Sequence, residues 1–349
     1  MDLARHLAFN AFTVVVEPLL FQLTSYQPSD LTYGRSSLPY NEHEIKLQSK
    51  EYIHEEYKID FKSKHIDSKV TSFLYYQTIR STKVEPRNTD IVFIHGLHEY
   101  GGRLLEFGHH FLDLGFRMVV LDLPGFGRSS GLPGYFTNTR VFSDAVHSVV
   151  QDLKERNTGP SRKLFVCGGS LGGYTTLRYA LDHPEGLTAV AVQAPLIYVS
   201  PESRPPKIVE YVGQVVLPIL GRLPIVEGNK GKNSADPRID EEFENDPMGY
   251  HGNVRVASGL AIISGVEELR EELENLSVPF LTQHGDHDRA TSHKGSIELV
   301  EKTKKLPDSK KKLIMYTGCE HDMFRDAQGP EVIKDLLEWL VERDNESSQ

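Results

Sequence analysis

The sequence predicts an α/β fold in which a mostly parallel β-sheet carries helices on both faces. Short continuous apolar runs recur along the chain, amphipathic helical stretches separate most of them, and one insertion rich in proline and glycine interrupts the alternation. Continuous apolar runs are typical of strands buried on both faces, and their alternation with helices is typical of βαβ units. At 349 residues the chain fits one large domain with an insertion.

Residues 1–54 are expected to form an extension ahead of an α/β domain over residues 55–349. The run Leu7–Val16 is apolar and ends at Glu17-Pro18, and it predicts a helix. Residues 25–50 are polar and turn-rich, which indicates a connecting arm. Ten apolar residues are too few to span a bilayer, and a secretory cleavage site is missing. Two interpretations stay open: a helix packed on the domain, or an interfacial helix with its apolar face in lipid.

Within the domain, runs of β-branched and aromatic residues predict strands, and apolar residues at intervals of three and four predict helices. Two such runs near the start are expected to pair as a hairpin. The expected elements, in chain order, are strands Glu56–Phe61, Thr71–Ile79 and Ile91–Ile94, helix Arg103–Leu114, strand Met118–Leu121, helix Thr139–Leu153, strand Leu164–Val166, helix Tyr174–Leu181, strands Leu187–Val192 and Phe280–Gln283, helix Ile297–Lys305, strand Leu313–Tyr316 and helix Glu331–Val341.

The insertion covers about residues 195–265 and is expected to form a cap or lid. It carries an apolar stripe at helical spacing from Ile208 to Leu223, which Pro218 should kink. An insertion at this point would lie over the carboxyl ends of the strands, where ligands bind in such sheets. The stripe either fills the space between the insertion and the body, or forms a lid whose apolar face meets a lipid substrate.

Composition excludes several classes of protein. The formal net charge is −10 and the pI is about 5.8, which argues against a nucleic-acid partner, since phosphate binding needs a basic face. Charged residues make up 25% and hydrophobic residues 39%, a balance typical of globular proteins. Only Cys167 and Cys319 occur, so a disulfide framework or cysteine-rich zinc module is excluded, and a reducing, cytoplasmic location is expected.

The pattern G-x-S-x-G occurs twice, at Ser170 and at Ser129. A nucleophile elbow needs a strand directly before the serine and a helix directly after it. Ser170 meets this requirement, because an apolar run precedes it and a helical stretch follows it. Ser129 is followed by Leu-Pro-Gly, which cannot open a helix at once, so Ser129 is expected in a loop. The sequence therefore predicts Ser170 as the nucleophile.

A serine nucleophile needs a histidine as base and a carboxylate that orients the histidine. After an elbow of this kind the expected chain order is Ser, then Asp or Glu, then His. Asp286 and Asp288 both follow the strand that starts at Phe280, and His321 follows the last expected strand. Each would reach the crevice at the carboxyl end of the sheet.

The tetrahedral oxyanion of acyl transfer requires two backbone N–H groups. One should come from Leu171, directly after the nucleophile. The other should come from the turn Ile94-His-Gly-Leu97 after the first core strand, where Gly96 lets the backbone bend, so Leu97 is the expected second donor.

Several segments resemble those of one known group. The segment from His95 to Arg103 resembles an HG-x-x-E-x-x-x-R motif, the segment from Asp122 to Ser129 resembles D-x-x-G-x-G-x-S, and Gly285-x-x-Asp288 and His321-Asp322 match the acid and base motifs. With the elbow, these residues resemble the monoacylglycerol lipase-like branch of the α/β-hydrolases, in the serine aminopeptidase-type family. The resemblance covers about residues 57–340.

The resemblance implies an α/β-hydrolase fold with a cap, and a serine hydrolase that cleaves carboxylic esters through an acyl-enzyme. It implies catalytic roles for Ser170, Asp288 and His321, a monoacylglycerol or related lipid ester as substrate, and no cofactor or metal. The elbow reads Gly-Gly-Ser-Leu-Gly, whereas the group often has His before the serine and Met after it, a departure that bears on substrate preference.

Alternative functions remain at this stage. The same machinery would serve a lysophospholipase, a short-chain carboxylesterase or an aminopeptidase. His284-Gly-Asp-His287-Asp288 packs metal-ligand residue types, although the spacing matches no common zinc motif. A catalytically silent lipid-binding protein on the same fold is the non-enzyme alternative. Peripheral contact with membranes or lipid droplets, through the lid or the N-terminal helix, is the remaining expectation.

Overall fold

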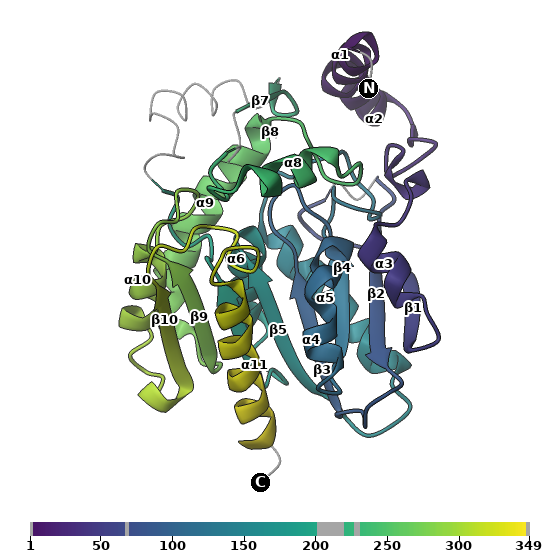
Figure 1. Ribbon diagram of the computed structural model, residues 1–349. Helices are drawn as coiled ribbons and strands as arrows, with labels where there is room; N and C mark the ends of the chain where they lie inside the picture. Colours follow the sequence, from purple (N-terminus) through teal and green to yellow (C-terminus); the bar gives the residue numbers. More distant parts are fainter. Residues whose placement is uncertain (1–2, 67–69, 201–219, 227–230, 347–349) are drawn as a thin grey trace.

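The computed structural model describes residues 3–66, 70–200, 220–226 and 231–346, with side chains from Leu7 onward. Its centre is an eight-stranded sheet in the order β1-β2-β4-β3-β5-β6-β9-β10 (Figure 1). The strands from β4 to β10 run parallel, and β1 and β2 add an antiparallel hairpin at one edge. The strands are β1 Tyr52–Asp60, β2 Phe73–Ser81, β3 Thr89–Ile94, β4 Arg117–Asp122, β5 Lys163–Gly169, β6 Ala189–Gln193, β9 Phe280–Gly285 and β10 Lys311–Tyr316.

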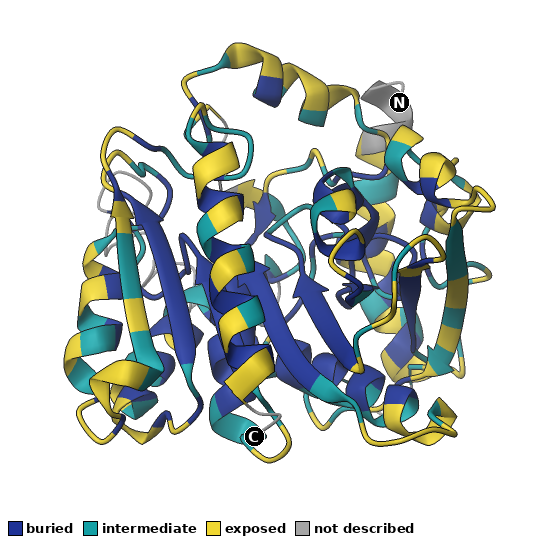
Figure 2. Cartoon of the chain, turned by 60° about the horizontal axis from the view of Figure 1, so that its bottom comes forward, coloured by how far each residue is buried: buried dark blue, intermediate teal, exposed yellow. Residues whose placement is uncertain are grey.

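Helices cover both faces of this sheet. Side chains alternate across a strand, so Val92 and Ile94 of β3 pack into one buried cluster, while Ile91 and Phe93 pack into another. Figure 2 shows the central strands buried between the two layers. The first cluster takes apolar residues from α5 Arg140–Arg156, α6 Leu171–Asp182 and α10 Lys294–Lys302, and the second from the 3₁₀ helix η3 Gly101–Phe107, α4 Gly108–Leu112 and α11 Gly329–Glu346.

The α/β-hydrolase fold expected from the sequence is confirmed, and each expected strand and helix of the sheet occurs in the expected order. The expected helix Arg103–Leu114 is split into a 3₁₀ segment and a short α-helix. Elsewhere the ends differ by a few residues. Apolar periodicity identifies elements well, but end positions depend on caps and tertiary contacts.

The helical start of the chain continues beyond the apolar run. α1 Leu3–Ala11, the π-helical turn η1 Phe12–Val16 and α2 Glu17–Leu23 follow one another without a break. Glu17 and Pro18 end the apolar run but do not end the helical segment. Pro18 lies in the first turn of α2, where its missing N–H is tolerated, and the π-helical turn separates it from α1.

The polar arm before β1 is more ordered than its composition indicated. It contains a 3₁₀ turn η2 Arg35–Ser37 and a helix α3 Glu42–Leu47, which begins with a capping box between Asn41 and Glu44. The motif Asn-x-x-Glu could have predicted this helix. Glu44 is fully buried and pairs with Arg128 at 3.1 Å, so the arm packs on the body through a buried ion pair.

Between β6 and β9 the chain forms a cap, which lies over the carboxyl ends of the strands (Figure 1). Its described elements are β7 Pro224–Val226, α8 Pro237–Asn245, β8 Val254–Arg255 and α9 Val256–Glu272. The N–H of Tyr250 donates to the carbonyl of His98 at 2.9 Å, which joins the cap to the loop after β3. Most of the expected apolar stripe from Ile208 to Leu223, with the kink expected at Pro218, lies outside the described residues, which resume at residue 220.

No helix among the described residues is long and apolar enough to cross a lipid bilayer. Cys167 and Cys319 are both buried and both free thiols.

Candidate active site

Ser170 stands on a sharp turn between β5 and α6. Its backbone has φ 53° and ψ −120°, a strained conformation for a residue with a side chain. The turn is closed so tightly that a Cβ added to Gly168 would lie 2.5 Å from the backbone of Gly172, and one on Gly172 would lie 2.1 Å from the carbonyl oxygen of Ile94. Only glycine fits at both positions. The local structure therefore has the form that the pattern around Ser170 predicted.

The turn after β3 lies beside the serine. A Cβ built on Gly96 would be 3.7 Å from the Cβ of Ser170. Leu97 follows in this turn, and Leu171 is the first residue of α6, where the N–H has no acceptor within the helix. The N–H of Gly96 donates to Glu99 Oε2 at 2.9 Å, so Glu99 braces the turn.

The carboxyl ends of β9 and β10 bring Asp288 and His321 together. His321 Nδ1 donates to Asp288 Oδ2 at 2.8 Å, and the Asp288 side chain is completely buried. Backbone N–H groups of Ala290 and Thr291 donate to the other carboxylate oxygen at 2.8 and 2.9 Å, and the Thr291 hydroxyl donates to Oδ2 at 2.8 Å. This set of donors fixes the carboxylate and, through it, the imidazole.

Electrostatics favour the charged carboxylate. Burial alone would raise the pKa of Asp288, but the charge and hydrogen bond of His321 and the hydrogen bond of His284 outweigh it and hold the pKa well below its usual range. Burial alone would lower the pKa of His321, but the charge and hydrogen bond of Asp288 reverse this and raise it. The pair is thus suited to hold a proton on His321 while Asp288 stays ionised.

A second histidine, His284, touches the same carboxylate. Its Nε2 lies 3.1 Å from Asp288 Oδ2, and its Nδ1 lies 2.8 Å from the hydroxyl of Ser296. Burial lowers the pKa of His284, which favours the neutral ring. A neutral ring with its proton on Nε2 would donate to the carboxylate and accept at Nδ1 from Ser296. The sequence indicated His284 only as a residue of metal-ligand type. Its position four residues before Asp288, at the end of a strand, was the available signal.

The His284 contact leads to a prediction. If Asp288 acts with His321 in catalysis, replacing His284 with leucine removes one hydrogen bond to a charged group, worth roughly 1.5–3 kcal/mol, and kcat should fall about ten- to a hundredfold. His284→Gln keeps an N–H donor and should retain kcat within a few-fold. Steady-state kinetics of both variants, with unfolding midpoints measured alongside, test this. Equal activity of the two variants would show that the donor is not used.

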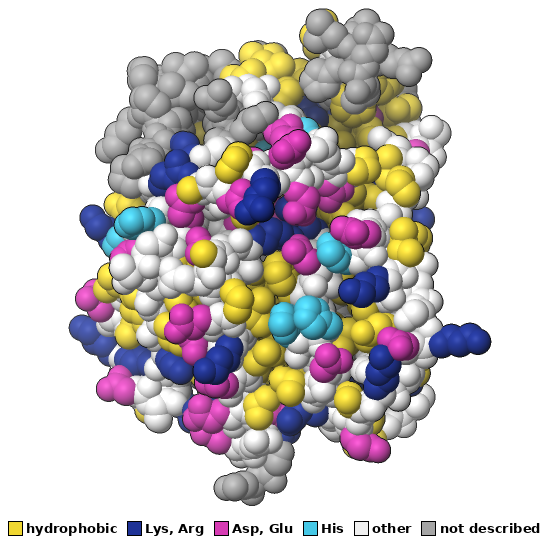
Figure 3. All heavy atoms as spheres, viewed as in Figure 1, with side chains coloured by type: hydrophobic (Ala, Val, Ile, Leu, Met, Phe, Trp, Pro, Cys, Tyr) yellow, Lys and Arg dark blue, Asp and Glu magenta, His cyan; other side chains and the backbone are white. Residues whose placement is uncertain are grey.

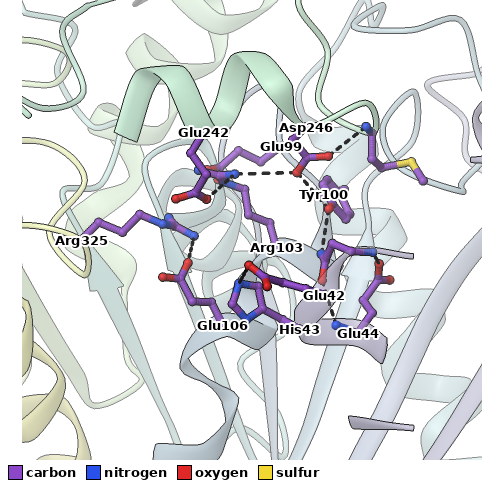
Figure 4. Close-up of polar contacts among 12 residues, drawn as sticks. Glu42, His43, Glu44, Glu99, Tyr100, Arg103, Glu106, Glu242, Asp246 and Arg325 are labelled. Carbon is purple, nitrogen blue, oxygen red and sulfur yellow. Dashed lines mark hydrogen bonds and ion pairs between the residues drawn. The ribbon is translucent and has the colours of Figure 1, made fainter. Parts of the chain in front are cut away.

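A polar cluster joins the turn after β3 to the cap (Figure 4). The buried Arg103 guanidinium lies 3.5 Å from Glu99 Oε1, and on the cap side 3.3 Å from Glu242 Oε1 and 3.7 Å from Asp246 Oδ2. Tyr100 donates to Asp246 Oδ2 at 3.0 Å. The carboxylate that braces Gly96 is therefore connected, through one arginine, to helix α8 and the residue that follows it.

The other candidates have different surroundings. Ser129 is buried in a loop, where its hydroxyl donates to the carbonyl of Asp122 and accepts from the N–H of Tyr75. Asp286 is exposed and accepts from the N–H of Gly318 at 2.6 Å. Among the described residues no group of three or more His, Cys, Asp and Glu side chains is arranged to hold a metal ion.

Comparison with known proteins identifies relatives. The family model described as "Serine aminopeptidase, S33" matches residues 85–328. The chain is 25% identical to the monoacylglycerol lipase of Mycolicibacterium smegmatis over an alignment of 257 residues. This alignment covers 74% of this chain and 89% of that protein. It is 26% identical over 261 residues to human monoglyceride lipase, covering 72% of this chain and 82% of that protein.

Solved structures give the same result. The monoacylglycerol lipase of Paleococcus ferrophilus superposes with a TM-score of 0.66 at 27% identity, covering 77% of this chain and 99% of that one. A monoglyceride lipase from Saccharomyces cerevisiae, solved with a substrate analogue, superposes with a TM-score of 0.70 at 21% identity, covering 87% of this chain and 98% of that one. The second likeness concerns the fold alone.

Proposed function

The chain belongs to the serine aminopeptidase (S33) family, and on that premise we propose that it is a serine hydrolase that cleaves lipid esters, with a monoacylglycerol or a closely related ester as substrate. The observation that carries the proposal is the 2.8 Å contact between His321 and Asp288. These residues follow the carboxyl ends of their strands, as the strained Ser170 does. Monoacylglycerol lipases among the relatives support the substrate class.

The proposed chemistry uses only groups of this chain. Nδ1 of His321 faces Asp288, which leaves Nε2 to take the proton of the Ser170 hydroxyl as its oxygen attacks the ester carbonyl. The N–H groups of Leu97 and Leu171 would stabilise the oxyanion, which removes roughly 3 kcal/mol from the barrier for each donor. The alcohol leaves with the proton from His321. Water then attacks the acyl-enzyme, and the fatty acid and free serine are released.

The test has two arms. A fluorophosphonate probe should label Ser170, and a catalytically silent lipid-binding protein would leave it unmodified. A series of acyl esters of increasing chain length, compared with monoacylglycerol and lysophospholipid, should give the highest kcat/KM with monoacylglycerol. A preference for short acyl chains or for lysophospholipid would replace this substrate with one of the alternative ester classes.

The proposed location is the cytoplasm, with peripheral contact to membranes or lipid droplets through the cap or the N-terminal helix. Two free buried thiols support a reducing compartment. An enzyme of water-insoluble esters also has to meet its substrate at a lipid surface.

A further inference from the structure

We propose that the helical segment from Leu7 to Leu23 is a docking surface for phospholipid membranes of no net charge, and that it turns the cap toward the lipid. The proposal deepens the proposed function, because it rests on a lipid ester as the substrate. It depends on three features of the described residues: the orientation of the apolar face, the absence of charge on that face, and the attachment of the segment to the cap.

The apolar face of the segment points away from the protein. Residues at intervals of three and four form this outward stripe, and their exposed fractions are 37% for Phe12, 59% for Val15, 44% for Val16, 52% for Leu19 and 80% for Leu23. The inward face carries the buried residues Thr13, Val14, Glu17 and Phe21. A surface helix of a globular protein normally keeps its large apolar residues toward the core, whereas this segment exposes five of them in addition to the buried Val14 and Phe21.

The outward stripe carries no charge. From Leu7 to Ser29 the sequence has one charged residue, Glu17, and that residue is fully buried. Its carboxylate accepts from the hydroxyl of Tyr33 at 2.9 Å and pairs with Arg222 at 2.8 Å. Surfaces that bind protein partners usually have a polar, charged rim. A long uncharged apolar stripe instead suits the boundary between headgroups and acyl chains.

The segment is attached to the cap. Arg222, two residues before β7, donates to the carbonyl of Thr13 at 3.1 Å as well as to Glu17. The same guanidinium lies 5.5 Å from the ring centre of Phe21. Ile225 of β7 is 57% exposed. Figure 1 shows α1 and α2 at the same end of the molecule as β7 and β8, and Figure 3 shows hydrophobic side chains at that end.

This placement gives the docking surface a direction. Since the cap lies over the carboxyl ends of the strands, an N-terminal segment in the lipid boundary would hold the cap and the active-site end of the sheet against the membrane. The chain has a net charge of −10, so an anionic bilayer would repel it. Zwitterionic phospholipid is therefore the expected partner, and binding should be insensitive to salt because no charge pair is involved.

The experiment uses the full chain and vesicles of phosphatidylcholine in a co-sedimentation assay. The double substitution V15D/L19D should lower the bound fraction at least about tenfold, because it places two charges in the apolar boundary. The matched control is I45D on α3, since Ile45 is also 57% exposed but lies on a different helix. This control should bind as the parent does. Unfolding midpoints of all three proteins check folding.

Activity separates this proposal from the proposed function. Hydrolysis of a water-soluble short-chain ester should be the same in the parent and in V15D/L19D, whereas hydrolysis of monoacylglycerol in vesicles should fall in the variant. Equal vesicle binding by the parent and V15D/L19D overturns the docking proposal. The proposal also fails if the parent does not bind vesicles but forms a dimer that V15D/L19D cannot form, because the apolar face would then bind a second copy of the chain. If no ester is hydrolysed but the binding difference persists, the docking proposal holds and the proposed function fails.

Discussion

Replacing Ser170 with alanine is expected to reduce turnover of a chromogenic acyl ester by about ten thousandfold or more, because the proposed acyl-enzyme could not form without the hydroxyl. Alanine keeps the Cβ and removes only the hydroxyl, so the strained turn and the fold should persist. Initial rates with the purified variant measure the loss, and the unfolding midpoint checks that the protein is still folded.

Ser129 provides the matched control, since it stands in the same five-residue pattern but in a buried loop. S129A should keep the turnover of the parent, although the lost hydrogen bonds to Asp122 and Tyr75 should lower its unfolding midpoint. Turnover by S170A at the rate of the parent would refute the assignment of the nucleophile.

Replacing Asp288 with asparagine is expected to lower kcat by roughly a thousand- to ten-thousandfold, because the amide no longer holds His321 in the tautomer that accepts the serine proton. The pH profile should move as well. In the proposed mechanism His321 acts as a base in its neutral form, so kcat/KM should rise with pH through the pKa of His321. Asp288 raises that pKa. The residual activity of D288N should therefore reach its plateau at a lower pH than that of the parent.

D286N is the control for this substitution, because Asp286 lies in the same loop but is exposed and contacts the N–H of Gly318. It should change kcat by less than about threefold and leave the pH profile in place. A larger loss in D286N than in D288N would assign the acid to Asp286.

The sequence predicted the parts of the fold that depend on local patterns. Apolar runs in β3, β5 and β9 identified the strands, because a strand buried on both faces needs apolar residues on both. The residues around Ser170 also distinguished it from Ser129, because the strand, the turn and the helix of a nucleophile elbow are all encoded within a few neighbouring residues.

Features that depend on distant contacts were missed. Ser296, on α10, contacts the ring of His284 and so orients the group that contacts Asp288. The ion pairs of Arg103 with Glu242 and Asp246 join residues about 140 positions apart.

The guanidinium of Arg103 has a consequence for protein engineering. Selectivity in capped hydrolases could be altered by grafting the cap of a relative onto this body. Arg103 is buried and has two of its counter-charges, Glu242 and Asp246, on the cap. A grafted cap without acidic residues at these two positions would leave the buried Arg103 guanidinium with Glu99 as its remaining counter-charge, beside the turn that Glu99 holds by a hydrogen bond. Such chimaeras need both acidic residues transplanted together with the cap, or Arg103 replaced by an uncharged residue at the same time.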